Sequence, residues 1–189
     1  PGLEPVLVPA ACDDGIRALP VLVPLVTPGH RKAVTAEAMG RGFAGAATLI
    51  DPTAILARST RFGEGFQVNA AVVIGANCEF GRHVLLNRSA SIGHDARVED
   101  FASLGPGCVL CGSCRIGAGA FIGGGATLAP GVSVGANAIV GAQRDLGARP
   151  RRADGAAVGR GVDRVAGGTG AGLGEAVAFR QRHACHLRP

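Results

Sequence analysis

An apolar residue recurs at every sixth position from Ile50 to Leu146 without a gap. The positions are Ile50, Leu56, Phe62, Val68, Ile74, Phe80, Leu86, Ile92, Val98, Leu104, Leu110, Ile116, Ile122, Leu128, Val134, Val140 and Leu146. The fourth residue after each is usually small, with Phe66 and Arg144 as exceptions. A period of six matches neither an α-helix nor one flat strand. It is typical of a parallel β-helix, in which a hexad is a short strand plus a turn.

The repeat predicts a mainly β fold in which residues 50–146 form a triangular coil. Three hexads make one turn of the prism, so the sixteen hexads from 50 to 146 give a little over five coils. The recurring aliphatic is expected to stack on its copies in the coils above and below. Glycine or asparagine often follows it, and we expect these residues to supply the backbone freedom of the corners.

The flanking segments lack the six-residue period. Within residues 1–49, a strand is expected at Val21–Val26, a helix at Arg31–Met39 and a second strand at Ala47–Ile50. This pattern indicates a partial, Rossmann-like α/β unit without the glycine-rich loop that opens a complete nucleotide-binding domain. Asp13 and Asp14 could bind a ribose or base, or form a solvated turn. Residues 147–189 form an irregular tail rich in Gly, Ala and Arg.

Charge and cysteine usage exclude several classes of function. The net charge is +5, and the tail from residue 144 carries nine Arg against four acidic residues. No aromatic residues alternate with these arginines, so nucleic-acid binding is not expected. Cys78, Cys108 and Cys114 occupy the small interior position. Cys108, Cys111 and Cys114 are spaced by three but alternate between interior and corner positions, and no such pair is joined by a second pair or a histidine at zinc-ligand spacing, so no metal is expected. His183-Ala184-Cys185-His186 is interpreted as a solvated segment.

The sequence predicts a cytoplasmic protein with no membrane partner. The apolar run Leu19–Val26 is too short to span a bilayer and is broken by Pro20 and Pro24. The cysteines indicate no disulfide framework, which favours a reducing compartment.

Two histidines in the coil, His83 and His94, are candidates for chemistry. A packed β-helix leaves no interior cavity, so a site must lie on its corners or between subunits. His94 is followed directly by Asp95, and a carboxylate next to a histidine can orient the ring and stabilise its protonated form. The spacing alone does not decide between a general base and an exposed turn residue.

Several motifs resemble the sialic acid O-acetyltransferase family called NeuD, which includes the PglD-like UDP-4-amino-sugar N-acetyltransferases. These motifs are Asn87-x6-His94-Asp95, Asp100-Phe101, Gly105-Pro106-Gly107, Gly112, Ile116-Gly117, Phe121-Ile122-Gly123, and the link Ala47–Ala54. The similarity covers residues 21–143. It implies left-handed winding, an acyltransferase domain over residues 50–146 and a truncated sugar-nucleotide-binding remnant over residues 1–49.

The resemblance implies an acetyl-CoA-dependent acetyltransferase acting on an amine or hydroxyl of a nucleotide-linked amino sugar or sialic-acid-like sugar. It implies a homotrimer with acetyl-CoA between adjacent coils. His94 would be the general base, with Asp95 raising its basicity and the backbone N–H near Gly112 stabilising an oxyanion.

The resemblance also assigns binding positions. Ser103, Gly112, Gly124 and Ala142 fall at cofactor-contact positions, with Ser103 standing where members commonly place a second histidine. Asn87 falls at a substrate position, and Asp13, Asp14 and Thr27 are the remaining candidates for sugar binding.

Two alternatives stay open. A γ-type carbonic anhydrase shares this coil but needs three histidines around zinc, whereas the coil holds only His83 and His94, eleven residues apart. A non-catalytic trimeric scaffold or decayed paralogue would fit Ser103 and the shortened front, whereas the His94-Asp95 pair disfavours it.

Overall fold

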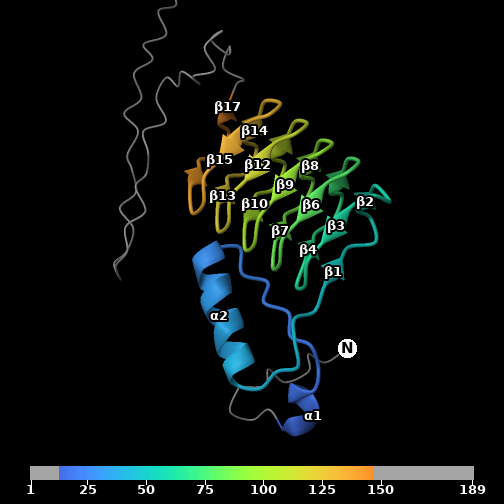
Figure 1. The fold of residues 1–189 in the computed structure, drawn as a ribbon, viewed down its shortest axis with the longest axis vertical. Coiled ribbons are helices and arrows are strands. Elements are labelled where there is room, and N and C mark those ends of the chain that lie inside the picture. The colour runs from blue at the N-terminus through green and yellow to red at the C-terminus, as the bar shows by residue number, and fades with distance from the viewer. Residues whose placement is uncertain (1–12, 147–189) are drawn as a thin grey trace, which may run out of the picture.

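The computed structural model describes residues 13–146, and the strands of this part form one triangular coil (Figure 1). Sheet 1 contains β1 (Leu49–Ile50), β4 (Gln67–Val68), β7 (Leu85–Leu86), β10 (Ser103–Leu104), β13 (Phe121–Ile122) and β16 (Ile139–Val140). Sheet 2 contains β2 (Ile55–Leu56), β5 (Val73–Ile74), β8 (Ser91–Ile92), β11 (Val109–Leu110), β14 (Thr127–Leu128) and β17 (Asp145–Leu146). Sheet 3 contains β3 (Arg61–Phe62), β6 (Glu79–Phe80), β9 (Arg97–Val98), β12 (Arg115–Ile116) and β15 (Ser133–Val134).

Every strand pairs in parallel with the strand three places along the chain. Ser103 pairs with Leu85 on one side and with Phe121 on the other, so the register advances by one coil of eighteen residues. The same register holds in all three sheets, which places residues eighteen apart directly above one another. The predicted fold class, a mainly β, left-handed parallel β-helix, is confirmed.

The interior of the coil is built from the two expected sets of residues. The recurring aliphatics from Val68 to Val140 are at most 9 % exposed, and the small residues Ala90, Ala96, Ala102, Ala120 and Ala126 are fully buried. The expected interior cysteines, Cys78, Cys108 and Cys114, are fully buried free thiols. Burial raises the pKa of Cys108 to about 12, so this thiol stays protonated and behaves as a small apolar group.

Phe66 is the large residue at a small position, and it lies near the N-terminal end of the coil. Its ring stacks on Phe62 at 4.9 Å and packs against Phe80 at 5.0 Å between centroids. Phe66 is fully buried, whereas Phe62 is 44 % exposed. The larger side chain therefore fills the last layer of the core, where there is no complete coil below.

The corners correct our expectation for the glycines. Left-handed φ angles occur at the third residue after each aliphatic, from Gly65 to Gln143, and not at the residue directly after it. Glycine directly after the aliphatic instead allows the next coil to approach. A Cβ added to Gly93 would lie 2.6 Å from the Gly112 nitrogen. Close approach of the next coil, rather than backbone freedom, explains these glycines from Gly63 to Gly123.

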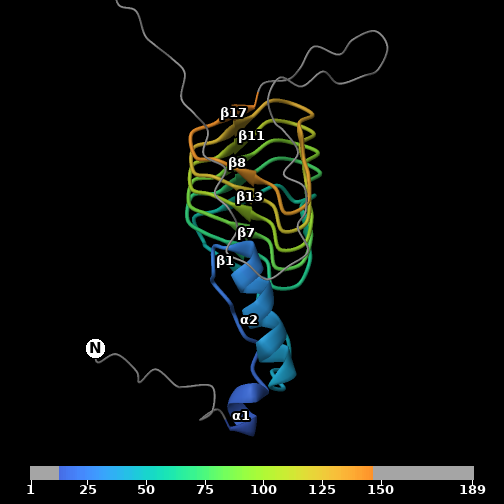
Figure 2. The ribbon, with the colours of Figure 1, turned by 90° about the vertical axis from the view of Figure 1, so that its left-hand side faces the viewer.

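The N-terminal part is less regular than expected (Figure 2). It contains α1 (Asp14–Arg17) and α2 (Pro28–Gly40). The second helix confirms the one expected at Arg31–Met39, but it begins earlier, at Pro28, and ends at Gly40. The predicted strand at Val21–Val26 is wrong, since only Val21 forms a parallel bridge, to Ala46. Pro20 comes directly before Val21, and Pro24 follows a short way after it. Proline has no main-chain N–H to donate to a neighbouring strand, which limits the pairing to one residue. The second expected strand is β1, which belongs to sheet 1 of the coil.

Arg31 joins α2 to the coil. Its guanidinium is fully buried and donates to the main-chain oxygens of His83 at 3.0 Å, Phe101 at 2.7 Å and Ala102 at 3.0 Å. It also donates to the oxygens of Leu25 and Val26 and to Ser103 Oγ. Burial lowers its pKa to about 10, so the group is still charged at neutral pH. Six oxygens from both parts of the chain therefore share one buried cation.

Candidate active site

His94 and Asp95 form the turn at the corner between sheets 2 and 3, after β8 and before β9. His94 Nδ1 lies 2.7 Å from Asp95 Oδ2, and because the carboxylate only accepts, the ring donates from Nδ1. The two side chains are 67 % and 51 % exposed. Hydrogen bonds from the side chains of His94 and Asn77 hold the pKa of Asp95 below its usual value. The pair therefore has an ionised carboxylate and a ring whose Nε2 is free to accept a proton.

Gly112 lies one coil above His94 and leaves room for its ring. A Cβ added to Gly112 would be 2.6 Å from His94 Nε2. The Gly112 main chain accepts from Gly131 N, and its own N–H has no hydrogen-bond partner among residues 13–146. His94 Nε2, a proton acceptor, and the Gly112 N–H, an unpaired main-chain donor among the described residues, therefore lie in successive coils on one open corner.

Asn87, Gly124 and Ala142 lie on a different corner, between sheets 1 and 2. Gly124 and Ala142 are eighteen residues apart and occupy equivalent places in successive coils. Asn87 Oδ1 accepts from Asn69 Nδ2 at 3.1 Å and from the Arg88 N–H at 2.9 Å. Within one chain, sheet 2 separates these three residues from His94.

Ser103 faces outward from sheet 1 but is fully buried beneath the N-terminal segment. Its hydroxyl donates to the Val26 oxygen at 2.6 Å and accepts from Arg31 at 2.8 Å. Both hydrogen-bonding functions of Ser103 are therefore used within the chain.

The three N-terminal candidates lie at helix starts. Asp13 caps α1 by accepting from the Ile16 N–H at 2.9 Å, and Asp14 lies 3.7 Å from Arg17 in the same helix. Thr27 is the N-cap residue of α2, but its side chain makes no capping bond. Asp13 and Asp14 therefore have local structural partners at the start of α1, and Thr27 belongs to a different helix.

The other coil histidine, His83, also lies at a corner, but its ring is packed. It stacks on Phe101 with centroids 4.6 Å apart, and burial lowers its pKa. Among the described residues, no group of three His, Cys, Asp or Glu side chains could hold a metal ion. The tail histidines lie outside these residues.

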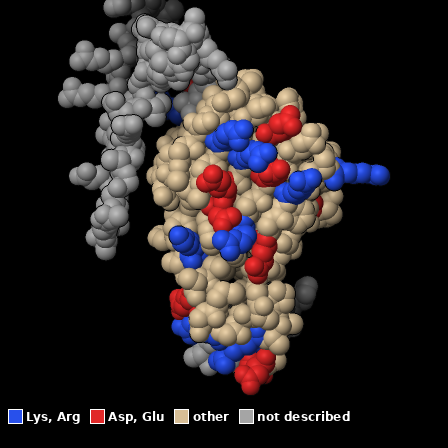
Figure 3. All heavy atoms as spheres, viewed as in Figure 1, with Lys and Arg blue, Asp and Glu red and all other residues tan. Residues whose placement is uncertain are grey.

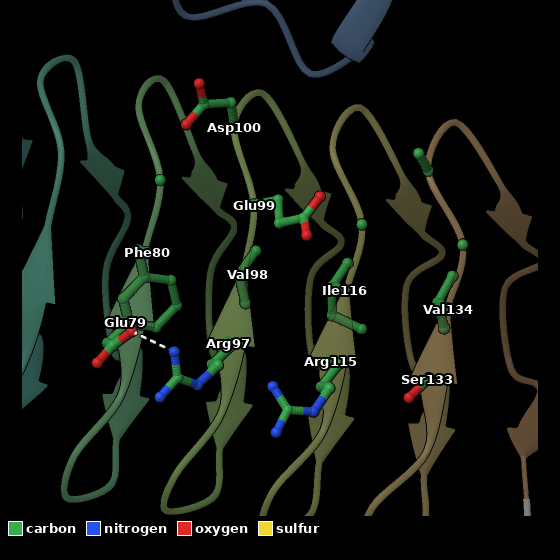
Figure 4. A pocket seen from close by; sticks show the side chains of 14 residues that line it. Glu79, Phe80, Arg97, Val98, Glu99, Asp100, Arg115, Ile116, Ser133 and Val134 are labelled. Carbon is green, nitrogen blue, oxygen red and sulfur yellow. Dashed lines mark ion pairs between the residues drawn. The ribbon is translucent and has the colours of Figure 1, made fainter.

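A shallow groove of about 620 Å³ lies on the outer face of sheet 3 (Figure 4). Glu79 and Arg97 pair across it at 2.9 Å, and Arg115 extends from the next strand. Glu99 and Asp100 lie at its turn side, where Asp100 pairs with Arg82 at 2.8 Å. Acidic and basic side chains are interspersed on the face seen in Figure 3, so this surface has no excess of one charge.

Asn77 was missed by the sequence reasoning. It contacts Asp95 from the coil below, eighteen residues earlier in the chain. The spacing of one coil was the signal that could have identified it.

The fold and this corner define a left-handed β-helix of the hexapeptide-repeat class with a histidine–aspartate pair on its surface. Residues 113–143 match the family model described as bacterial transferase hexapeptide (six repeats). The expected resemblance to hexapeptide-repeat sugar acetyltransferases is confirmed by solved structures.

One similar structure is GDP-perosamine N-acetyltransferase from Caulobacter crescentus, solved as a histidine-to-alanine mutant with CoA and GDP-perosamine. The identity is 35 % and the TM-score 0.62, over 67 % of this chain and 61 % of that one. PerB from the same organism, also with CoA and GDP-perosamine, gives 36 % and 0.62, over 67 % and 62 %. This chain thus spans about three fifths of their length.

The acetyltransferase domain of PglB from Neisseria gonorrhoeae FA1090, in complex with acetyl coenzyme A, is 28 % identical with a TM-score of 0.62. The match covers 75 % of this chain and 67 % of that one. No curated protein matches the chain. None of the helices in residues 13–146 is long and apolar enough to cross a membrane, and cytoplasmic localisation stays a prediction.

Proposed function

We propose that this protein is an acetyl-CoA-dependent acetyltransferase whose acceptor is an amine or hydroxyl of a nucleotide-linked amino sugar or sialic-acid-like sugar. The observation that carries the proposal is the His94 ring, bonded through Nδ1 to Asp95 and placed with Nε2 beside Gly112 on an open corner. The similar structures contain CoA with GDP-perosamine or acetyl coenzyme A, which supports this substrate class.

The chemistry follows from the groups at the corner. Acetyl-CoA supplies a thioester that an amine or hydroxyl can attack. His94 Nε2 accepts the proton that the attacking group loses, and Asp95 stabilises the positive charge that the ring then carries. The C–S bond then breaks, and CoA leaves as a thiolate that can take up the proton from the ring. The Gly112 N–H can donate to the carbonyl oxygen on which negative charge develops. A positioned base of this kind contributes about 10²–10⁴-fold to the rate.

The outer faces of the coil support a homotrimer. Sheet 3 presents Arg61, Glu79, Arg97, Arg115 and Ser133 to solvent, whereas sheet 2 presents Ile55, Val73, Ser91, Val109 and Thr127. Ile55, Val73 and Val109 are 65 %, 43 % and 36 % exposed in the single chain. An apolar stripe of this kind is typical of a surface that another subunit covers.

A cyclic trimer would also explain the separation of the predicted site residues. In a head-to-tail interface, two different surfaces of the same chain meet between neighbouring subunits. Sheet 2 has His94 at one edge and Gly124 and Ala142 at the other. Packing against sheet 2 could bring the His94 corner of one subunit to the Gly124 corner of the next. Light scattering on the purified protein should therefore give three times the chain mass.

Thiol release from acetyl-CoA tests the activity directly. With GDP-perosamine as acceptor, the wild-type protein should release CoA, and His94→Gln should lower kcat by about 10²-fold or more because it removes the base. His83→Gln is the matched control, since its ring is stacked on Phe101 at another corner. Equal rates for wild type and His94→Gln would reject the proposal. A trimer without any CoA release over a panel of amino-sugar acceptors would favour the scaffold.

A further inference from the structure

Asp95 is held from the coil below as well as by His94. The Asp95 N–H donates to the Ala76 oxygen at 2.8 Å, which places residues 76–77 directly beneath the His94-Asp95 turn. Asn77 and Asp95 occupy the same position in successive turns and have nearly the same left-handed φ, 58° and 57°. The Asn77 side chain therefore lies one coil below the Asp95 carboxylate, and its amide helps to hold the pKa of that carboxyl below its usual value.

Asn77 is itself fixed by the coil beneath it. Its main-chain N–H donates to Ser59 Oγ at 2.8 Å. Asparagine is one of the few residues that adopts left-handed φ readily, so the sequence satisfies both the turn and the hydrogen bond. One vertical series of contacts, Ser59 to Asn77 to Asp95, therefore ends at the His94 ring.

We propose that Asn77 is a positioning residue, which holds the Asp95 carboxylate against Nδ1 of His94 and so leaves Nε2 unprotonated and facing Gly112. A carboxylate that is half exposed can rotate away from the ring, and an amide donor stacked beneath it opposes that rotation. A neutral imidazole carries its proton on only one nitrogen, and the partner of Nδ1 decides which one. The inference rests on the proposed function only for its catalytic consequence.

The described groups around this corner leave Asp95 as the acidic partner of the ring. Cys78 in the coil below is buried, and burial raises the pKa of its thiol. Gly112 and Ser113 in the coil above carry no charge, and Cys111 beside them is a free thiol. Arg97 on the following strand is paired with Glu79, and Arg58 lies two coils below His94. Among the described residues, Asp95 is therefore the charged group in contact with the His94 ring.

Two variants of Asn77 and one matched control test the proposal. Asn77→Gly removes the donor without backbone strain, because glycine adopts left-handed φ. Asn77→Asp replaces the donor with a second carboxylate. Asn137→Gly removes an asparagine with φ of 56° from the corner between sheets 3 and 1. Long-range ¹H–¹⁵N NMR of the full chain at alkaline pH reports the tautomer of His94, with His94→Gln used to assign its signals.

The neutral His94 ring should carry its proton on Nδ1 in the wild type and in Asn137→Gly. In Asn77→Gly the population should shift toward the Nε2–H tautomer, and kcat should fall roughly tenfold with KM unchanged. In Asn77→Asp the acidic limb of kcat/KM should move to higher pH, because a second carboxylate stabilises the imidazolium. Circular dichroism establishes that each variant is folded.

A tautomer ratio, a kcat and a pH profile in both Asn77 variants that match those of Asn137→Gly would overturn the proposal. The NMR readout needs no acetyl acceptor. A wild-type protein without transferase activity whose His94 tautomer still responds to Asn77 would therefore contradict the proposed function and leave the positioning role intact.

Discussion

The absence of a side chain at Gly112 is as important to the site as the presence of one at His94. The ring of His94 occupies the space into which a Cβ of Gly112 would project, with Nε2 only 2.6 Å from it. Contacts this short do not persist, so either the ring or the main chain would have to move. The ring is the exposed partner, whereas Gly112 is held between hydrogen-bonded neighbours.

Replacing Gly112 by alanine should therefore displace His94 Nε2, the proposed base, while the coil remains folded. We expect Gly112→Ala to lower kcat/KM by about 10²-fold, within the range that a general base contributes, with little change in melting temperature. The measurement is CoA release with a competent acceptor, together with thermal unfolding.

Gly135→Ala is the control for this substitution, because a Cβ at Gly135 would meet no atom within 4 Å among residues 13–146. Its kcat/KM should stay at the wild-type value. A Gly112→Ala variant as active as Gly135→Ala would show that His94 Nε2 does not act in the position described.

At the scale of the turn, the backbone is usually left-handed, and the free-energy cost of that conformation depends on the residue that adopts it. Nine non-glycine residues have φ between 53° and 62° at the third position after an aliphatic. Asn77 and Asp95 tolerate this conformation, but Ala71 gains nothing from it and is exposed. A left-handed alanine costs about 1–2 kcal/mol, which exceeds the extra entropy of glycine in the unfolded chain.

Ala71→Gly should accordingly raise the free energy of unfolding by about 0.5–1 kcal/mol. Urea unfolding followed by circular dichroism would measure it. The neighbouring Ala70 lies in the same turn without a left-handed φ, so Ala70→Gly should destabilise by a similar amount. If both substitutions destabilise the protein equally, the assigned backbone conformation of this turn is incorrect.

The regular coil could be predicted because every hexad places one apolar residue in the core. This requirement is visible at seventeen positions of the sequence. The role of the glycines was misjudged because the sequence does not show which neighbour lies above a residue. The approach of Gly93 to Gly112 follows only from the eighteen-residue register. The strand predicted at Val21–Val26 did not form because Pro20 and Pro24 interrupt the apolar run, so only Val21 pairs, with Ala46.

The candidate site likewise has one contact that could be predicted from the sequence and others that could not. His94 and Asp95 are adjacent in sequence, so their contact could be anticipated from local residues. Asn77, by contrast, acts across a coil boundary. The burial of Ser103 depends on a contact with Arg31, seventy-two residues earlier in the chain. Neither the length of a loop nor a motif encodes such a contact.

At the scale of the whole molecule, Arg31 is the main polar connection between the N-terminal part and the coil. A buried guanidinium without a carboxylate is tolerated only when oxygens surround it, and here five main-chain oxygens and Ser103 Oγ do so. Three of those oxygens belong to His83, Phe101 and Ala102 in the coil, and two belong to the segment before α2. Removing the cation would take a buried donor from all of these oxygens, of which Val26 O would keep only Ser103 Oγ and Ala102 O only the Leu85 N–H.

Arg31→Met should therefore release residues 13–48 from the coil without unfolding the coil itself, because each coil is stabilised mainly by its neighbours. The loss of docking free energy should be roughly 3 kcal/mol, comparable to breaking a buried ionic contact. Hydrogen exchange should then show protection of α2 reduced by about 10²-fold, while amides of the sheets exchange as in the wild type.

Arg31→Lys should behave similarly, since an ammonium cannot serve six oxygens in the planar arrangement that a guanidinium spans. Arg115→Met, on the exposed face of sheet 3, should leave all amides unchanged. If α2 and the sheets lose protection together in Arg31→Met, the N-terminal part and the coil form one cooperative unit, and Arg31 stabilises all of it.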